Sequence, residues 1–196
     1  MPFQDRKDEF AEARAAMVES QLRPQGIADP LILEAMGSTP RERFVPETAQ
    51  SLAYSDRAVP LGDGAWLMAP AALGLLLQSL EPAPGERALV VGTGSGYAVE
   101  LLRAIGVDAI EATLGEGDLP AGIFELILID GAVEKVPDAV IAQLAVGGRL
   151  AAAVSDRGVT RLMVGVQSGG GFGLRSIGDA AVPLLPGLER PRAFVF

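Results

Sequence analysis

The 196-residue sequence contains neither histidine nor cysteine. Without these residues the protein cannot contain a Ser-His-Asp or Cys-His triad, an imidazole base or a thiolate nucleophile. Disulfides are excluded too, as are the usual zinc sites, whose ligands are cysteine and histidine. We predict no metal site, although carboxylates alone can ligate Mg²⁺ or Ca²⁺. Catalysis by this chain would therefore have to use other groups.

Basic residues and long apolar runs are also scarce. The chain has 16 Lys and Arg against 25 Asp and Glu, for a net charge of −9, which argues against a broad electrostatic grip on nucleic acid. Glycine, proline and charged residues interrupt every apolar run before it reaches the ~20 residues that a membrane span needs. The N-terminus has mixed charge and no apolar stretch, unlike a signal peptide. We expect a soluble, cytoplasmic protein that binds neither nucleic acid nor a membrane, and the sequence leaves its oligomeric state open.

The first 80 residues are expected to be mainly helical. Apolar residues recur at helical spacing over 7–22. Asp29 followed by proline is typical of a helix start and predicts a second helix over 31–36. The stretch 37–70 is rich in proline and glycine and is expected to form loops, and 71–80 is an apolar helix. We expect residues 1–80 to form an N-terminal extension.

From residue 81 onward, the pattern changes to strands that alternate with helices. Helices are expected after Gly96 as far as Ile105, and over 137–144. Short apolar runs predict strands at 88–91, 108–112, 126–129, 149–154, 161–167, 172–176 and 193–196. This alternation is typical of an open α/β sheet of the Rossmann type. We expect residues 81–196 to form a Rossmann-like core, with the extension packed on it as one unit.

The strand 88–91 leads into five residues that we predict to bind a cofactor: Gly92, Thr93, Gly94, Ser95 and Gly96. Open α/β folds bind ligands at the carboxyl ends of their strands, where glycine lets a ligand approach the backbone. A dinucleotide-binding loop would have glycine where Tyr97 stands, which disfavours a nucleotide-dependent oxidoreductase. The G-x-G-x-G form resembles the first motif of S-adenosylmethionine-dependent methyltransferases. A tight turn between strand and helix is the alternative explanation.

Three acidic residues are further candidates for cofactor binding. Glu111 ends a short apolar strand, where its carboxylate could accept hydrogen bonds from both hydroxyls of a ribose. Asp118 follows in the next loop and could contact an adenine edge. Asp130 ends the apolar run 124–129 and should lie beside the glycine loop. The alternatives are a solvated strand end for Glu111, a plain turn for Asp118 and a helix N-cap for Asp130.

Six motifs in the region 15–154 carry a resemblance to a known family. They lie in order at 17–27, 40–46, 53–56, 59–64, 92–97 and 143–150. Together they make the sequence similar to the protein-L-isoaspartate O-methyltransferase family. The resemblance implies a class I methyltransferase fold and S-adenosyl-L-methionine as cofactor. It also implies methyl transfer to the side-chain carboxylate of L-isoaspartyl residues in proteins or peptides. A carboxylate is already a nucleophile at neutral pH, so this reaction needs neither histidine nor cysteine.

One departure from the family concerns the expected acceptor side. After the turn at 62–64 the family usually carries Gln-Thr-Ile-Ser and then proline, with the serine near the reacting carboxylate. Here the residues are Ala-Trp-Leu-Met-Ala-Pro, so Met68 stands at the serine position and Trp66 replaces a small polar residue. Trp66 and Met68 are predicted to contact the acceptor, with packing under the loop as the alternative, and no catalytic residue is assigned.

A second departure is a shortening after the glycine loop. Roughly 30 residues separate Gly96 from Leu126, where the family places two crossovers. Either 108–112 is the second strand and carries Glu111 as the ribose acid, or 109–117 is the later strand and no ribose acid remains. The cofactor pocket would then be open on one side. Two alternatives therefore stand beside the enzyme: a non-catalytic relative kept as a binding or interaction module, and a methyltransferase with a different acceptor.

Overall fold

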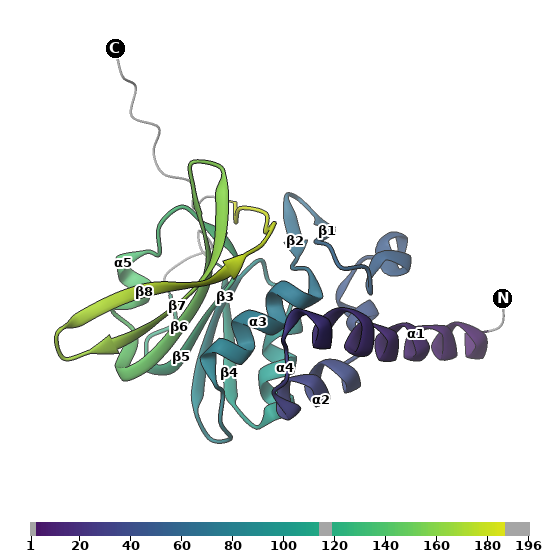
Figure 1. Ribbon diagram of the computed structural model, residues 1–196, viewed down its shortest axis with the longest axis horizontal. Coiled ribbons are helices and arrows are strands. Elements are labelled where there is room, and N and C mark those ends of the chain that lie inside the picture. Colours follow the sequence, from purple (N-terminus) through teal and green to yellow (C-terminus); the bar gives the residue numbers. More distant parts are fainter. Residues whose placement is uncertain (1–2, 114–118, 187–196) are drawn as a thin grey trace, which may run out of the picture.

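The fold is built on a six-stranded sheet with the strand order β4-β3-β5-β6-β7-β8 (Figure 1). The computed structural model describes residues 3–113 and 119–186. Strands β4, β3, β5 and β6 run parallel, and β7 and β8 add an antiparallel edge. The strands are β3 (Arg87–Gly92), β4 (Asp108–Thr113), β5 (Phe124–Val133), β6 (Leu144–Asp156), β7 (Val159–Ser168) and β8 (Gly171–Asp179). The predicted Rossmann-like sheet is confirmed.

The central strands are apolar on both faces, because each face is covered. Side chains alternate along a strand, so Val90 and Leu128 pack into one core cluster and Val91 and Ile129 into the other. All four are fully buried. This explains why the parallel strands read as continuous apolar runs. Because the strands are parallel, their carboxyl ends meet at one edge of the sheet.

Two helices cover one face of the sheet: the last of those expected before residue 81, and the one that follows the glycine loop. Helix α3 (Pro70–Leu80) contacts β6 and β7, and α4 (Tyr97–Ile105) contacts β3 and β4. Helix α2 (Pro30–Ser38) begins at Asp29, whose carboxylate accepts hydrogen bonds from two backbone amides of the first turn. Helix α1 (Phe3–Met17) continues into a π-helical turn, Val18–Leu22, and a 3₁₀ turn, Arg23–Gln25. Buried residues of these helices share a single core cluster with the sheet.

The segment between α2 and α3 has more structure than the sequence predicts. It contains two 3₁₀ turns, Arg41–Phe44 and Glu47–Leu52, and a short antiparallel hairpin. The hairpin strands are β1 (Val59–Gly62) and β2 (Ala65–Leu67). Its strands are only four and three residues long, and one has a proline at its second position, so the strand signal is weak. The hairpin stands above the carboxyl edge of the sheet (Figure 1).

Two other expectations need comment. The helix predicted over 137–144 is wrong in its length: α5 covers only Asp138–Ile141. Leu144 already pairs with Phe124 of β5 and therefore belongs to strand β6, not to the helix. The strand predicted at 193–196 lies outside the described residues. The division into parts 1–80 and 81–196 stays a prediction. Among the described residues, no helix is both long and apolar enough to cross a membrane.

Candidate cofactor and acceptor site

The glycine loop lies at the carboxyl end of β3, between β3 and α4. Gly94 and Gly96 have φ angles of +79° and +74°, which residues with a side chain rarely adopt. A Cβ on Gly92 would lie 3.2 Å from Cβ of Asp130 and 3.5 Å from Oε1 of Glu111. Ser95 accepts a hydrogen bond at Oγ from the amide of Tyr97, at the start of α4. The loop thus presents bare backbone, with an acidic residue on either side.

The position of Glu111 depends on which of the two strand assignments for the shortened region is correct. Strand β4 pairs in parallel with β3, so the segment 108–113 is the second strand of the unit and Glu111 lies beside the glycine loop. The amide of Gly96 donates a hydrogen bond of 3.0 Å to Oε2 of Glu111. Burial raises the pKa of Glu111, against the opposite effect of the Gly96 and Gly94 amides. Glu111 is therefore partly buried and engaged with the loop.

The shortening itself is visible around β4. Between Ile105 at the end of α4 and Phe124 at the start of β5, the described residues contain β4 alone. Strand β4 is consequently the edge of the sheet on this side. The position predicted for Asp118 lies outside the described residues.

Asp130 lies within β5, which continues to Val133, so this residue does not cap a helix. Its side chain is only 2% exposed, and in the described structure its Oδ1 has no hydrogen-bond partner. Burial raises the pKa of Asp130 to about 7; the charge of Glu111 adds to this rise and that of Arg41 opposes it. A carboxyl group so placed exchanges a proton near neutral pH.

Arg41 is a site residue that the sequence does not reveal. It is fully buried, and its Nε donates a 2.7 Å hydrogen bond to the carbonyl of Ala53. Its Nη2 donates to the carbonyl of Met68. The guanidinium lies over the Tyr97 ring, with 5.0 Å between Cζ and the ring centroid. Arg41 thus holds the residues that follow the hairpin against the start of α4. Its motif at 40–46 is visible in the sequence, but nothing there marks this arginine as buried.

A small hollow adjoins the glycine loop and brings four predicted residues together: Trp66, Met68, Thr93 and Asp130. Met68 is 2% exposed and packs into the core, whereas Trp66 is 39% exposed at the rim. The remaining wall comes from Gly64, Gly131 and residues 182–185. No sequence signal marked the segment 182–185. Hydrogen bonds at 2.9 and 2.8 Å tie it to Ala132 of β5.

Comparison with known proteins identifies the family of this chain. The family model described as protein-L-isoaspartate(D-aspartate) O-methyltransferase matches residues 12–113. A protein-L-isoaspartate O-methyltransferase of Methylorubrum extorquens is 38% identical over 91% of this chain and 90% of its own length. The chain belongs to the protein-L-isoaspartate O-methyltransferase family. A second relative, from Rhodopseudomonas palustris, is 31% identical over 83% of this chain and 78% of its own.

Solved structures of the same family share the fold. One is a protein-L-isoaspartate O-methyltransferase from Plasmodium falciparum in complex with S-adenosyl-L-homocysteine, with a TM-score of 0.72 at 19% identity. The match covers 88% of this chain and 97% of that one. Another structure with the same enzyme name also gives a TM-score of 0.72, at 17% identity, over 90% of this chain and 67% of that one. The class I methyltransferase fold that was expected is confirmed.

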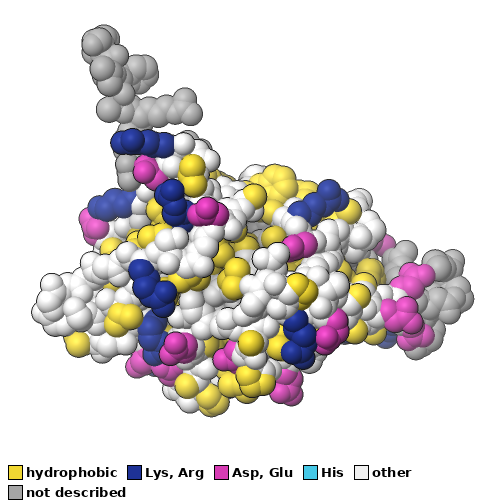
Figure 2. All heavy atoms as spheres, in the orientation of Figure 1, with side chains coloured by type: hydrophobic (Ala, Val, Ile, Leu, Met, Phe, Trp, Pro, Cys, Tyr) yellow, Lys and Arg dark blue, Asp and Glu magenta, His cyan; other side chains and the backbone are white. Residues whose placement is uncertain are grey.

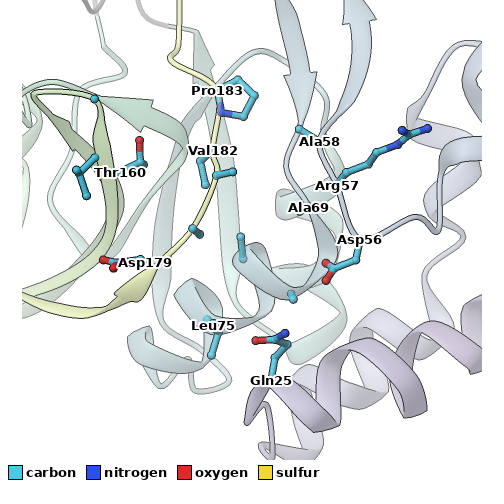
Figure 3. Close-up of a pocket in the computed structure, with 16 residues that line it drawn as sticks. Gln25, Asp56, Arg57, Ala58, Ala69, Leu75, Thr160, Asp179, Val182 and Pro183 are labelled. Carbon is cyan, nitrogen blue, oxygen red and sulfur yellow. The ribbon is translucent and has the colours of Figure 1, made fainter.

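In this family member a larger hollow of about 980 Å³ lies next to the small one (Figure 3). The two share Val182 and Pro183. Figure 3 shows Thr160 and Asp179 on the side of the antiparallel strands, and Gln25 and Leu75 on the side of the helices. The segment that carries Val182 thus forms a wall of both hollows.

The surface and the acidic groups add two observations. Figure 2 shows acidic and basic side chains interspersed over the visible face rather than gathered by sign. Over residues 3–113 and 119–186, no group of three or more acidic side chains could hold a metal ion. The visible face therefore shows no broad surface of one charge.

Proposed function

We propose that this chain is an S-adenosyl-L-methionine-dependent O-methyltransferase that esterifies the side-chain carboxylate of L-isoaspartyl residues in proteins or peptides. One observation carries this proposal. The glycine loop and Glu111 lie at the same sheet edge as a hollow lined by Trp66, Met68 and Asp130. The family membership and the relative in complex with S-adenosyl-L-homocysteine support it. A cytoplasmic location is a further proposal, based on the sequence.

The residues present fit the cofactor. In the loop, Gly94 is exposed and Gly96 is half-buried, and the buried hydroxyl of Thr93 has no hydrogen-bond partner in the described structure. Backbone amides of the loop would contact the cofactor, and the carboxylate of Glu111 would accept hydrogen bonds from ribose hydroxyls. When bound, S-adenosyl-L-methionine would supply a methyl group attached to a positively charged sulfur. The sulfur is the leaving group and becomes a neutral thioether when the methyl group is transferred.

The other side chains of the site would position the acceptor and exclude water. Met68 and Leu185 provide buried apolar walls, and Trp66 covers the rim of the hollow. Orientation and exclusion of water are the main requirements when the nucleophile is a carboxylate, because no proton has to be removed from it. A site without histidine and cysteine suffices for this chemistry.

A second candidate is a methyltransferase with an acceptor other than a carboxylate. The place of Asp130 in the hollow favours it, because an ionised carboxylate there would repel an acceptor of the same charge. For an acceptor that must lose a proton, ionised Asp130 would instead serve as a base. The two candidates therefore differ in the sign of their pH dependence.

Ester formation on a defined peptide tests the proposed function. The purified protein is incubated with S-adenosyl-L-methionine and a peptide that carries one L-isoaspartyl residue. A matched control peptide carries ordinary aspartate at the same position. We expect mass spectrometry to detect one methyl ester on the isoaspartyl peptide and none on the control. A protein that binds the cofactor but esterifies neither peptide has another acceptor, and a protein that does not bind it is a non-catalytic relative.

A further inference from the structure

Asp130 is the acidic group that the structure places inside the small hollow. It reaches this place from the central strand β5, and Thr93 of the glycine loop and Met68 line the same hollow. Its Oδ1 is buried and has no hydrogen-bond partner in the part of the chain that the structure describes. Buried polar atoms are normally paired, so an unpaired one that lines a hollow indicates a group that a ligand satisfies.

The charged groups around Asp130 come from two neighbouring elements. Glu111 on β4 carries a charge of the same sign, and Arg41 on the 3₁₀ turn Arg41–Phe44 carries the opposite one. Arg41 in turn faces Tyr97 on α4. Two nitrogens of the Arg41 guanidinium donate hydrogen bonds to the carbonyls of Ala53 and Met68. Residues 182–185, which also line the hollow, contain no titratable group. Over residues 3–113 and 119–186, no close ion pair therefore holds Asp130 in its ionised form.

A neutral carboxyl group differs from an ionised one in a way that matters here. In its neutral form it donates one hydrogen bond, whereas in its ionised form it only accepts. An acceptor carboxylate needs a donor, and it is repelled by a second negative charge in a site from which water is excluded. Protonated Asp130 can therefore bind an anionic acceptor, and ionised Asp130 opposes its binding.

We propose that Asp130, in its protonated form, donates a hydrogen bond to the acceptor carboxylate and is an acceptor-binding residue of this chain. This inference rests on the proposed function. The other side chains of the hollow are less suited to this role. Met68, at the position where the family usually has serine, donates no hydrogen bond. Thr93 belongs to the loop that would hold the cofactor, and Trp66 lies at the exposed rim.

The proposal fixes the direction of the pH dependence. The acceptor carboxylate is ionised throughout the neutral range, so Asp130 is the group that changes. With a pKa of about 7, Asp130 loses its proton as the pH rises through neutrality. Binding of the isoaspartyl peptide should then weaken by about tenfold per pH unit on the alkaline side. The affinity for the cofactor should change much less.

Trp66 provides the readout, because it is the sole tryptophan of the chain and lines the hollow. The complex with S-adenosyl-L-homocysteine is titrated with an isoaspartyl peptide that lacks tryptophan, at several pH values from about 5.5 to about 9. The fluorescence of Trp66 is followed during each titration. The variants are Asp130→Asn, which donates from its amide at every pH, and Asp130→Leu, which cannot donate. Asp138→Asn, an exchange of the same kind at a side chain that is 82% exposed on α5, is the matched control.

We expect wild type and Asp138→Asn to lose peptide affinity as the pH rises, Asp130→Asn to bind independently of pH, and Asp130→Leu to bind weakly throughout. The inference is overturned if Asp130→Asn and wild type follow the same pH curve, or if wild-type affinity rises with pH. It is also overturned if Asp130→Asn chiefly weakens S-adenosyl-L-homocysteine binding, which would make Asp130 a cofactor ligand. The ester assay separates a failure of this inference from a failure of the proposed function. If wild type forms the ester and yet shows one of these results, the inference alone is contradicted. If wild type forms no ester at any pH, the proposed function is contradicted.

Discussion

The two halves of the site differ in what they are made of. The half that would hold the cofactor consists of backbone between β3 and α4, together with the hydrogen bond from Gly96 to Glu111. The half that would hold the acceptor consists mainly of side chains from three separate segments, which include Met68, Asp130 and residues 182–185. Backbone function depends on a few glycines, whereas side-chain function changes with each substitution. The first half therefore keeps the family pattern, and the second half carries what is particular to this chain.

Arg41 joins the acceptor half to the rest of the fold, and its removal should have the largest effect on stability. Arg41→Met removes the donors to Ala53 and Met68 and leaves both carbonyls buried without a partner. We expect the free energy of unfolding in urea to fall by about 3 kcal/mol. Arg41→Lys should recover only part of this loss, because lysine lacks the planar fork of donors.

Arg43→Met is the matched control, since Arg43 is exposed on the same 3₁₀ turn. Its effect on the free energy of unfolding should stay within about 0.5 kcal/mol. Equal losses in the two variants would show that burial of Arg41 does not anchor the acceptor half.

Asp130 should make stability depend on pH in a direction that is unusual for an aspartate. Its pKa is raised to about 7 in the folded protein, against about 3.9 in the unfolded chain. Between these values the folded state binds more protons, so this contribution to stability is present at low pH and is lost as the pH rises toward 7. Replacement by asparagine should remove the loss and increase the free energy of unfolding at pH 8 by roughly 2 kcal/mol.

Urea unfolding of wild type, Asp130→Asn and Asp138→Asn at several pH values provides the measurement. Asp138→Asn should follow the wild-type curve. If the Asp130→Asn curve also has the wild-type shape, Asp130 is not the buried group that titrates near neutral pH.

Glu111 should affect the cofactor half alone. Glu111→Gln keeps an acceptor for the Gly96 amide but weakens every hydrogen bond that the charged oxygens accept. We expect the affinity for S-adenosyl-L-methionine to fall about tenfold, with the KM for the isoaspartyl peptide unchanged at saturating cofactor. Calorimetry and steady-state kinetics check the two quantities, with Glu100→Gln on the exposed side of α4 as control. A larger effect on the peptide than on the cofactor would remove the distinction between the halves.

The cofactor half could be predicted from the sequence because its signals are local. An apolar run, three glycines and a following helix stand within 18 residues, 88–105, and each has a direct physical meaning. Glu111 followed from the next strand, although only the pairing of β4 with β3 decided its place. The class of fold followed in the same way from the alternation of strands and helices.

The acceptor half could be predicted only in part, because it is assembled from distant residues. Trp66 and Met68 stood out against the family pattern, but the wall at 182–185 lies more than a hundred residues away and carries no pattern of its own. Burial of Arg41 could not be predicted either, since arginine is usually exposed and only tertiary carbonyls satisfy it here. The short hairpin and the early start of β6 depend likewise on pairing partners that a local pattern does not show.

Cofactor binding by the glycine loop is tested most directly by calorimetric titration with S-adenosyl-L-methionine. Three proteins are compared: wild type, Gly94→Val and Gly147→Val. Gly147 also has a positive φ, +83°, but lies near the start of β6, at the opposite edge of the sheet. Valine is strained at both positions, so the pair separates strain from contact with the cofactor. We predict binding by wild type and Gly147→Val, and no detectable binding by Gly94→Val. Unchanged affinity in Gly94→Val, or no binding by wild type, would contradict a cofactor site on this loop.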